Sequence, residues 1–199
     1  MIFKGERRPV LPGFSEPAVD SQRSFRILLE AMSHPGRVFR LGVNMKVPEP
    51  LQVASAAVAL ALLDFETPLW TDLASDSEAL NWVRFHSGCP LAEDPFSGRF
   101  ALITGEFGLS SMGQFHPGLD ESPEDSATLI IQVRGMAFGR GKKLTGPGIE
   151  KEHHLDVEGL ADDFWENWKA NQRCYPLGVD VILTAGRELA GLPRTTRGE

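Results

Sequence analysis

The sequence predicts an α/β fold in which helices cover a mixed β-sheet. Short runs of branched apolar residues at 127–133 and 178–185 are typical of strands buried on both faces. Four segments with helical periodicity alternate with such runs, which is the pattern of a layered α/β protein. The run at 127–133 is closely followed by GMAFG, which predicts a hairpin and therefore antiparallel neighbours in the sheet.

Length and composition indicate one globular domain covering residues 1–199. The chain is 42% hydrophobic and 24% charged, and its net charge of −7 argues against a general nucleic-acid binder. No apolar run follows the basic N-terminus, and the longest one, 53–63, is far shorter than the roughly 20 residues of a membrane span. The two cysteines suit a reducing compartment. We therefore expect a cytoplasmic protein that contacts neither membrane nor nucleic acid.

The first predicted helix lies within 19–36. Asp20 or Ser21 is expected to cap it, and His34-Pro35-Gly36 is expected to end it. Four apolar residues recur at i, i+3, i+4 and i+7, the spacing of a single helix face directed at the core. These residues are Phe25, Leu28, Leu29 and Met32.

Two further helices are expected in the first half of the chain. The segment 49–64 has Pro50 near its first turn and is apolar almost all round, so it should be buried on several sides. The segment 75–88 starts with a capping-box spacing from Ser75 to Glu78 and ends at Gly88.

The remaining elements are one helix, several strands and a loop. The helix is expected within 157–172, with Leu160, Phe164 and Trp168 on one face. The segment 110–125, rich in Gly, Pro and acidic residues, is expected to be a surface loop. The expected strands are 100–106, 127–133 and 178–185, with weaker candidates at 67–73 and 134–139.

The stretch FGRGKKLTGPGIE, 138–150, superficially resembles a phosphate-binding loop. Such a loop needs G-x-x-x-x-G-K-[ST], so that backbone amides, a lysine and a hydroxyl converge on phosphates and magnesium. Aligning Gly141-Lys142 to this pattern places Met136 at the first glycine and Lys143 at the hydroxyl. We predict instead an edge strand with both lysines facing solvent, followed by a Gly-Pro-Gly turn.

Metal and nucleophile patterns are weak. His153-His154 is flanked by acidic residues, but adjacent histidines point apart and a metal site needs three or four converging ligands. His86 and Cys89 have too few partners for the same role. The sequence contains no G-x-S-x-G elbow and no serine–lysine pair at catalytic spacing. We therefore assign neither a metal site nor a catalytic residue.

The C-terminal segment carries the best polar candidates. Asp180 lies within an apolar strand, where an unpaired buried carboxylate would be costly. Three roles are open for the arginines near the end of the chain. They can bind a phosphate or the carboxylates of a partner, they can pair locally with Asp180, or they can belong to a frayed tail. The candidate ligand- or partner-binding residues in this segment are Arg194, Thr195, Thr196 and Arg197.

Four ordered segments give the chain its resemblance to a known family. They are FRILLEAMSHPGR, LTGPGI, YPLGVDVILTAG and LPRTTR, and they span nearly the whole sequence. Together they resemble the PhnH family, a subunit of the bacterial carbon–phosphorus lyase complex of phosphonate metabolism. His34 and Arg37 lie in the first segment and are added to the candidate binding residues.

The resemblance implies a fold and the absence of a cofactor. PhnH proteins form a three-layer α/β/α sandwich that resembles the large domain of pyridoxal-phosphate-dependent transferases but lacks the cofactor. A Schiff-base lysine must be desolvated or otherwise tuned. Polar surroundings in the sequence, which do not suit that role, are shared by Lys142, Lys143, Lys151 and Lys169.

The resemblance also implies a function. With the other core subunits, such a protein supports an ATP-dependent step in which a phosphonate displaces adenine and gives a ribose 1-phosphonate 5-triphosphate. We expect a subunit without its own catalytic centre, partnered by the other core subunits or by a second copy in isolation. The alternative is a free-standing binder or transferase acting on a small phosphate- or phosphonate-bearing substrate.

Overall fold

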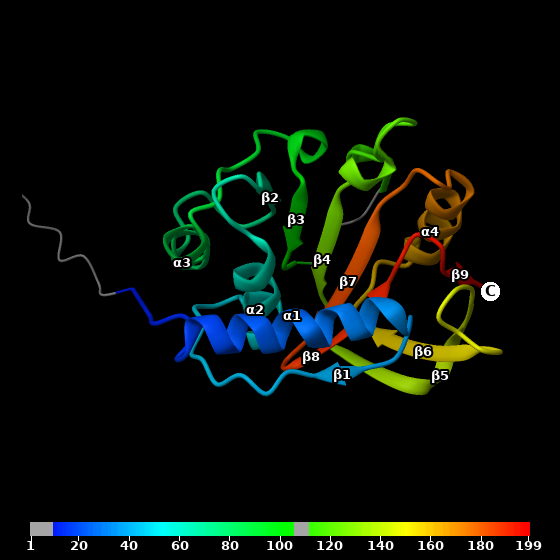
Figure 1. The fold of residues 1–199 in the computed structure, drawn as a ribbon, viewed down its shortest axis with the longest axis horizontal. Helices are drawn as coiled ribbons and strands as arrows, with labels where there is room; N and C mark the ends of the chain where they lie inside the picture. The colour runs from blue at the N-terminus through cyan, green and yellow to red at the C-terminus, as the bar shows by residue number, and fades with distance from the viewer. Residues whose placement is uncertain (1–9, 106–111) are drawn as a thin grey trace, which may run out of the picture.

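A six-stranded sheet forms the centre of the computed structural model, which describes residues 10–105 and 112–199 (Figure 1). Its strand order is β1-β8-β7-β4-β3-β2. The four strands β7, β4, β3 and β2 run parallel, and β8 and β1 are antiparallel to their neighbours. The bounds are β1 Phe39–Arg40, β2 Leu69–Thr71, β3 Phe100–Ile103, β4 Thr128–Gln132, β7 Asp180–Ala185 and β8 Glu188–Leu192.

The sheet is mixed, as predicted, but for a different reason. The antiparallel pairs are β1–β8 and β7–β8, and the chain turns between β7 and β8 at Gly186, whose φ is +57°. The predicted hairpin between 127–133 and 134–139 is wrong, because the second segment starts β5 (Gly135–Thr145) in a separate three-stranded sheet. That sheet has the order β6-β5-β9, with β6 at His153–Glu158 and β9 at Arg197–Gly198.

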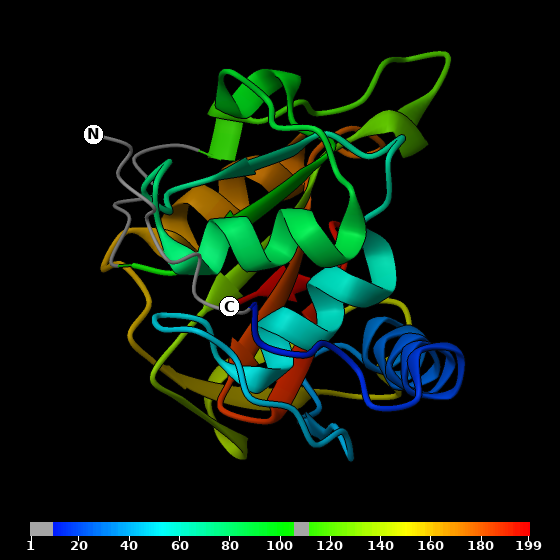
Figure 2. The same cartoon turned by 90° about the vertical axis from the view of Figure 1, so that its left-hand side faces the viewer.

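Three helices cover one face of the large sheet (Figure 2). They are α1 (Pro17–Ser33), α2 (Val53–Leu62) and α3 (Glu78–Ser87). α2 packs against β4 and β7 and is buried on several sides, as its composition predicts. Its first turns consist mainly of alanines with no exposed surface, which allow close packing on the strands.

The opposite face is covered by α4 (Phe164–Arg173) and the small sheet. Phe164 and Trp168 of α4 are fully buried there, as predicted, but Leu160 precedes the helix. Successive side chains of β4 point to opposite faces of the sheet: Ile130 packs with α1–α3, and Leu129 packs on the α4 side. The chain thus forms three layers, but one outer layer is only partly helical.

The sequence predicts the residues at which the helices end better than those at which they begin. α1 stops before His34 and α3 stops at Gly88, whose φ is +72°. The predicted caps are wrong: Glu16 precedes α1, and Ser77 rather than Ser75 accepts a hydrogen bond from the backbone of α3. α2 begins at Val53, three residues after Pro50.

The predicted core face of α1 is only partly correct. Leu28 is buried, but Phe25 is 41% exposed and Leu29 is 53% exposed. The reason is a close approach of α1 to β8: a Cβ at Gly191 would lie 2.7 Å from the carbonyl oxygen of Ala31. The buried side of α1 is instead formed by Asp20, Ser24, Leu28 and Ala31.

The loop predicted at 110–125 lies partly outside the described residues. The described part contains two short 3-10 turns, Met112–Gln114 and Pro123–Asp125. Met112 and Phe115 are buried in the core on the α4 side, so this loop is anchored at its start. Within 10–105 and 112–199, no helix has the length and apolar character needed to cross a bilayer.

Candidate functional site

Arg194 and Asp180 form an ion pair at the amino end of β7. The guanidinium Nη2 lies 2.7 Å from Oδ2 of Asp180, and Nε lies 3.3 Å from Oδ1. The backbone N–H of Arg194 also donates to Oδ1 at 2.7 Å. The two side chains are 13% and 20% exposed. The local pairing left open by the sequence is therefore present.

The same guanidinium joins several other segments. Nη1 donates to the carbonyl oxygens of Pro123 at 2.8 Å and Pro176 at 3.3 Å, and Nη2 donates to the hydroxyl of Ser126. A planar guanidinium with five N–H donors suits such a junction. Because these donors are used within the chain, Arg194 holds the amino ends of β4 and β7 together.

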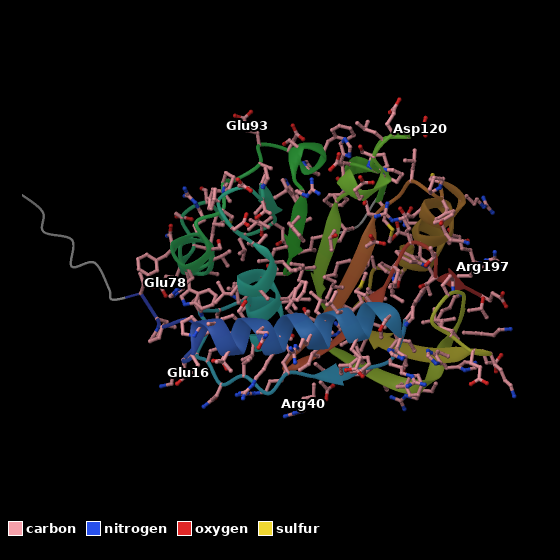
Figure 3. All side chains as sticks on the ribbon, in the orientation of Figure 1. Glu16, Arg40, Glu78, Glu93, Asp120 and Arg197 are labelled. Carbon is pink, nitrogen blue, oxygen red and sulfur yellow. The ribbon has the colours of Figure 1, made fainter. Side chains whose placement is uncertain are left out.

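The residues after Arg194 are ordered rather than frayed. Thr196 is fully buried, and its carbonyl accepts a hydrogen bond from Nε1 of Trp168 at 2.9 Å. Its hydroxyl has no partner among the described residues. Arg197 starts β9, pairs in register with Thr145 of β5 and has an exposed side chain (Figure 3). Thr195 is half-buried.

His34 and Arg37 lie just after α1. Nδ1 of His34 is 3.0 Å from both the hydroxyl of Ser33 and the carbonyl oxygen of Glu30, so this ring closes the last turn of the helix. Arg37 is exposed, and its side chain makes no hydrogen bond or ion pair within 10–105 and 112–199. The structure thus leaves Arg37 free to meet an anion or a carboxylate.

The turn at Gly146–Gly148 brings these two regions together. A Cβ at Gly146 would lie 2.8 Å from the carbonyl oxygen of Thr195, and one at Gly148 would lie closer still to that of Ser33. Both glycines have positive φ, +132° and +81°. The LTGPGI segment therefore fits between the end of α1 and the LPRTTR segment. Glycine is needed there because two backbones approach each other closely.

The lysines before this turn are paired with local groups. β5 is the central strand of its sheet, so the predicted edge strand is wrong, although the predicted turn is confirmed. Nζ of Lys143 lies 3.0 Å from Oε2 of Glu199 and 3.8 Å from Oε2 of Glu152. Nζ of Lys142 lies 5.8 Å from the ring centroid of Trp165. Lys143 thus meets two acidic groups, unlike the lysine of a phosphate loop.

The hydrogen bond between Lys143 and Glu199 lowers the pKa of Glu199 below its ordinary 4.5 and raises that of Lys143 above 10.5. The pair's contribution to the docking of β9 is lost as pH falls through the lowered pKa of Glu199. It is also lost as pH rises through the raised pKa of Lys143.

An NMR titration of the side-chain carboxyl carbon of Glu199 should give a midpoint below 4.5. Lys143→Met should raise this midpoint and Lys142→Met should not. A wild-type midpoint at or above 4.5 would contradict the pairing.

His153 and His154 lie in β6. His153 is buried, and its Nδ1 lies 2.7 Å from the carbonyl oxygen of Pro35. His86 lies 2.9 Å from the carbonyl oxygen of Leu11 through Nε2, and Cys89 is a buried free thiol. Among the described residues, no three His, Cys, Asp or Glu side chains converge as metal ligands.

Polar residues at the carboxyl ends of the parallel strands were not predicted from the sequence. Asp72, after β2, accepts hydrogen bonds from the backbone of Thr104 at 2.9 Å and of Gly105 at 2.8 Å. Gln132, at the end of β4, accepts from the backbone N–H of Gln52 at 2.6 Å. Ligands of open α/β sheets bind at the carboxyl edge of the strands, so polar residues that follow the predicted strands could have been named as candidates from the sequence. These contacts connect the ends of β2 and β3 and join the end of β4 to the residue before α2.

The chain is similar in sequence to proteins of one family. Residues 12–199 match the family described as bacterial phosphonate metabolism protein (PhnH). The chain is 36% identical over 187 residues to the alpha-D-ribose 1-methylphosphonate 5-triphosphate synthase subunit PhnH of Rhizobium meliloti (strain 1021), covering 94% of each chain. It is 35% identical over 179 residues to the putative C-P lyase subunit protein HtxG of Stutzerimonas stutzeri, covering 88% of this chain and 84% of that protein. This chain belongs to the PhnH family.

Proposed function

We propose that this protein is a subunit of a carbon–phosphorus lyase core complex and supports formation of a ribose 1-phosphonate 5-triphosphate from ATP and a phosphonate. The observation that carries the proposal is the family match over residues 12–199. The names of the two relatives, one a synthase subunit and the other a C-P lyase subunit, support the same role. The nearly complete coverage extends the sequence likeness to almost the whole chain.

In the proposed reaction, a phosphonate oxygen forms a bond to C1′ of the ATP ribose. The bond between C1′ and the adenine nitrogen breaks, and adenine takes up a proton as it leaves. The triphosphate on C5′ is retained. Because substrate and product are both polyanionic, the complex needs cationic groups for binding. Arg37 and Arg197 are exposed cations of this chain on segments that meet the Gly146–Gly148 turn.

We further propose that this subunit acts by assembly and ligand positioning, without its own catalytic centre or pyridoxal phosphate. Lys143 supports this for its own side chain: its Nζ lies 3.0 Å from Oε2 of Glu199, which raises its pKa, whereas a Schiff-base lysine must lose its proton. The guanidinium of Arg194 is occupied by Asp180 and by backbone carbonyls. We expect the complex in the cytoplasm, where ATP is available, and a homodimer when the chain is isolated.

Co-expression with the other core subunits tests this proposal. The tagged chain should retain them at low and moderate salt, and the purified assembly should release adenine from ATP when methylphosphonate is added. The isolated chain should release none. If the isolated chain instead binds ATP or methylphosphonate by calorimetry and the subunits do not co-purify, the free-standing binder is the correct description.

A further inference from the structure

A hollow of about 310 Å³ lies between α1 and residues 41–43, which follow β1. Figure 1 shows this segment running back along α1 after β1. The residues that α1 contributes include polar and charged side chains as well as an apolar one. The volume is at the lower end of the range of ligand sites, about 300–1,000 Å³, so the hollow suits a small molecule better than a nucleotide.

The wall formed by residues 41–43 is held in place by Arg187, in the turn between β7 and β8. The backbone N–H of Leu41 donates to the carbonyl oxygen of Arg187 at 2.8 Å. The guanidinium of Arg187 donates through Nη1 to the carbonyl oxygen of Val43, and through Nη2 to Oδ1 of Asn44 at 3.1 Å. Because these bonds fix the wall, a ligand would pay little to order it.

Two arginines of α1 line the hollow. Arg23 and Arg26 are exposed, and their side chains have no ion pair or hydrogen bond within the described part of the chain. They lie three residues apart, where like charges repel, and an anion between them would remove the repulsion. Asp20 also lines the hollow, but its Oδ2 accepts from the backbone N–H of Glu16 at 3.0 Å. Glu30, one turn beyond Arg26, does not line it.

The hydroxyl of Ser24 is a buried polar group in the same hollow. Ser24 is 1% exposed, and its Oγ has no hydrogen-bond partner within 10–105 and 112–199. Buried hydroxyls are normally paired, because leaving one unpaired costs free energy. An anionic oxygen in the hollow would accept a hydrogen bond from it. Two guanidiniums and a hydroxyl thus outnumber the one carboxylate among the lining residues.

These groups suit a phosphonate or a phosphate ester better than a carboxylate. An organic phosphonate or phosphate monoester has three terminal oxygens on phosphorus, enough for two guanidiniums and a hydroxyl, whereas a carboxylate has two. The lining also includes the apolar residues Ile27, Leu41 and Val43. An organic substituent would lose water against them, and the fourth oxygen of inorganic phosphate would be left without a partner there.

We propose that this hollow binds a small organic phosphonate or phosphate monoester. Arg23, Arg26 and Ser24 hold the oxygens on phosphorus, and the apolar residues contact the organic substituent. The inference goes beyond the proposed function, because it assigns a binding site to this chain by itself and needs no other subunit.

Calorimetry on the full chain tests the site with methylphosphonate, methyl phosphate, inorganic phosphate, acetate and ATP. Methylphosphonate or methyl phosphate should bind most tightly of the five at low salt, and the tighter of the two identifies the source of the group. Arg23→Gln with Arg26→Gln should raise its Kd at least tenfold and flatten the salt dependence. The matched control is Arg84→Gln with Arg173→Gln, which removes the same charge from exposed positions of α3 and α4 outside the hollow. Its Kd should remain that of the wild type.

Ser24→Ala separates a binding role from a structural one. The hydroxyl has no partner among the described residues, so its removal should not lower the urea midpoint. The Kd should nevertheless rise about tenfold, the loss expected for a hydrogen bond to a charged group. A lowered midpoint with an unchanged Kd would show that Ser24 serves the fold and not a ligand.

The outcomes separate this inference from the proposed function. The site is wrong if no probe gives heat, if acetate, inorganic phosphate or ATP binds as tightly as methylphosphonate and methyl phosphate, or if the two double variants have equal Kd values. The proposed function stands in each case, because co-purification and adenine release test it separately. Should Arg23→Gln with Arg26→Gln lose the circular dichroism spectrum of the wild type, Ser24→Ala decides.

Discussion

Replacing Arg194 with leucine is expected to lower the free energy of unfolding by about 3–5 kcal/mol, the usual cost of removing one partner from a buried ion pair. The substitution leaves the carboxylate of Asp180, 20% exposed, without its guanidinium. It also removes the donors to Pro123 and Ser126. Urea unfolding followed by circular dichroism gives the change from the shift of the midpoint at constant slope.

Two control variants identify the cause of this loss. Arg40→Ala removes an exposed ion pair with Glu188, whose side chains are 70% and 37% exposed, and should cost less than about 1 kcal/mol. Combining Asp180→Leu with Arg194→Leu should recover part of the loss, because no unpaired charge remains. Similar midpoints for Arg194→Leu and Arg40→Ala would mean that the buried pair does not stabilise this junction.

Gly148→Ala is expected to destabilise the protein by about 3 kcal/mol or more. The backbone at Gly148 has φ +81°, and a Cβ there would clash with the carbonyl oxygen of Ser33 and lie 2.9 Å from Cδ of Pro35. Neither neighbour is the end of a flexible side chain. The end of α1 would therefore have to move away from the turn.

Gly139→Ala separates the steric clash from the backbone strain. Gly139 has φ +89°, but a Cβ added to it meets nothing within 4 Å. Its substitution should cost about 1–2 kcal/mol, the strain of the left-handed conformation alone. Equal urea midpoints for the two variants would show that the close contact of Gly148 with Ser33 contributes no stability.

Local patterns predicted most of the secondary structure. The apolar helix α2, the burial of Phe164 and Trp168, and the glycine that ends α3 each depend on nearby residues. The sheet to which β5 belongs depends on β6 and β9, which are distant in sequence or follow a turn, so the hairpin prediction failed there.

The side chains that face the core along α1 could not be predicted from periodicity. The spacing of Phe25 and Leu29 fits a core-facing stripe, but Gly191 of β8 brings a backbone against Ala31. The buried side of α1 consists of Asp20, Ser24, Leu28 and Ala31. The close approach is a tertiary feature, and no local pattern encodes it.

The candidate site was predicted in part. The need of Asp180 for a partner followed from the cost of a buried carboxylate, and Arg194 was one of its possible partners. The contact of LTGPGI with both the end of α1 and LPRTTR required the structure, because these segments are far apart in sequence. The binding roles of Arg37 and Arg197 remain predictions, and substituting each with glutamine in the assembled complex addresses them.

Adenine release by the reconstituted complex tests the central claim most directly. ATP and methylphosphonate are incubated with the other core subunits in the presence and absence of this chain, and free adenine is measured by chromatography. We predict release that depends on adding this chain, and none from the chain alone. An equal rate of release without this chain would contradict its assignment as a subunit that supports the reaction.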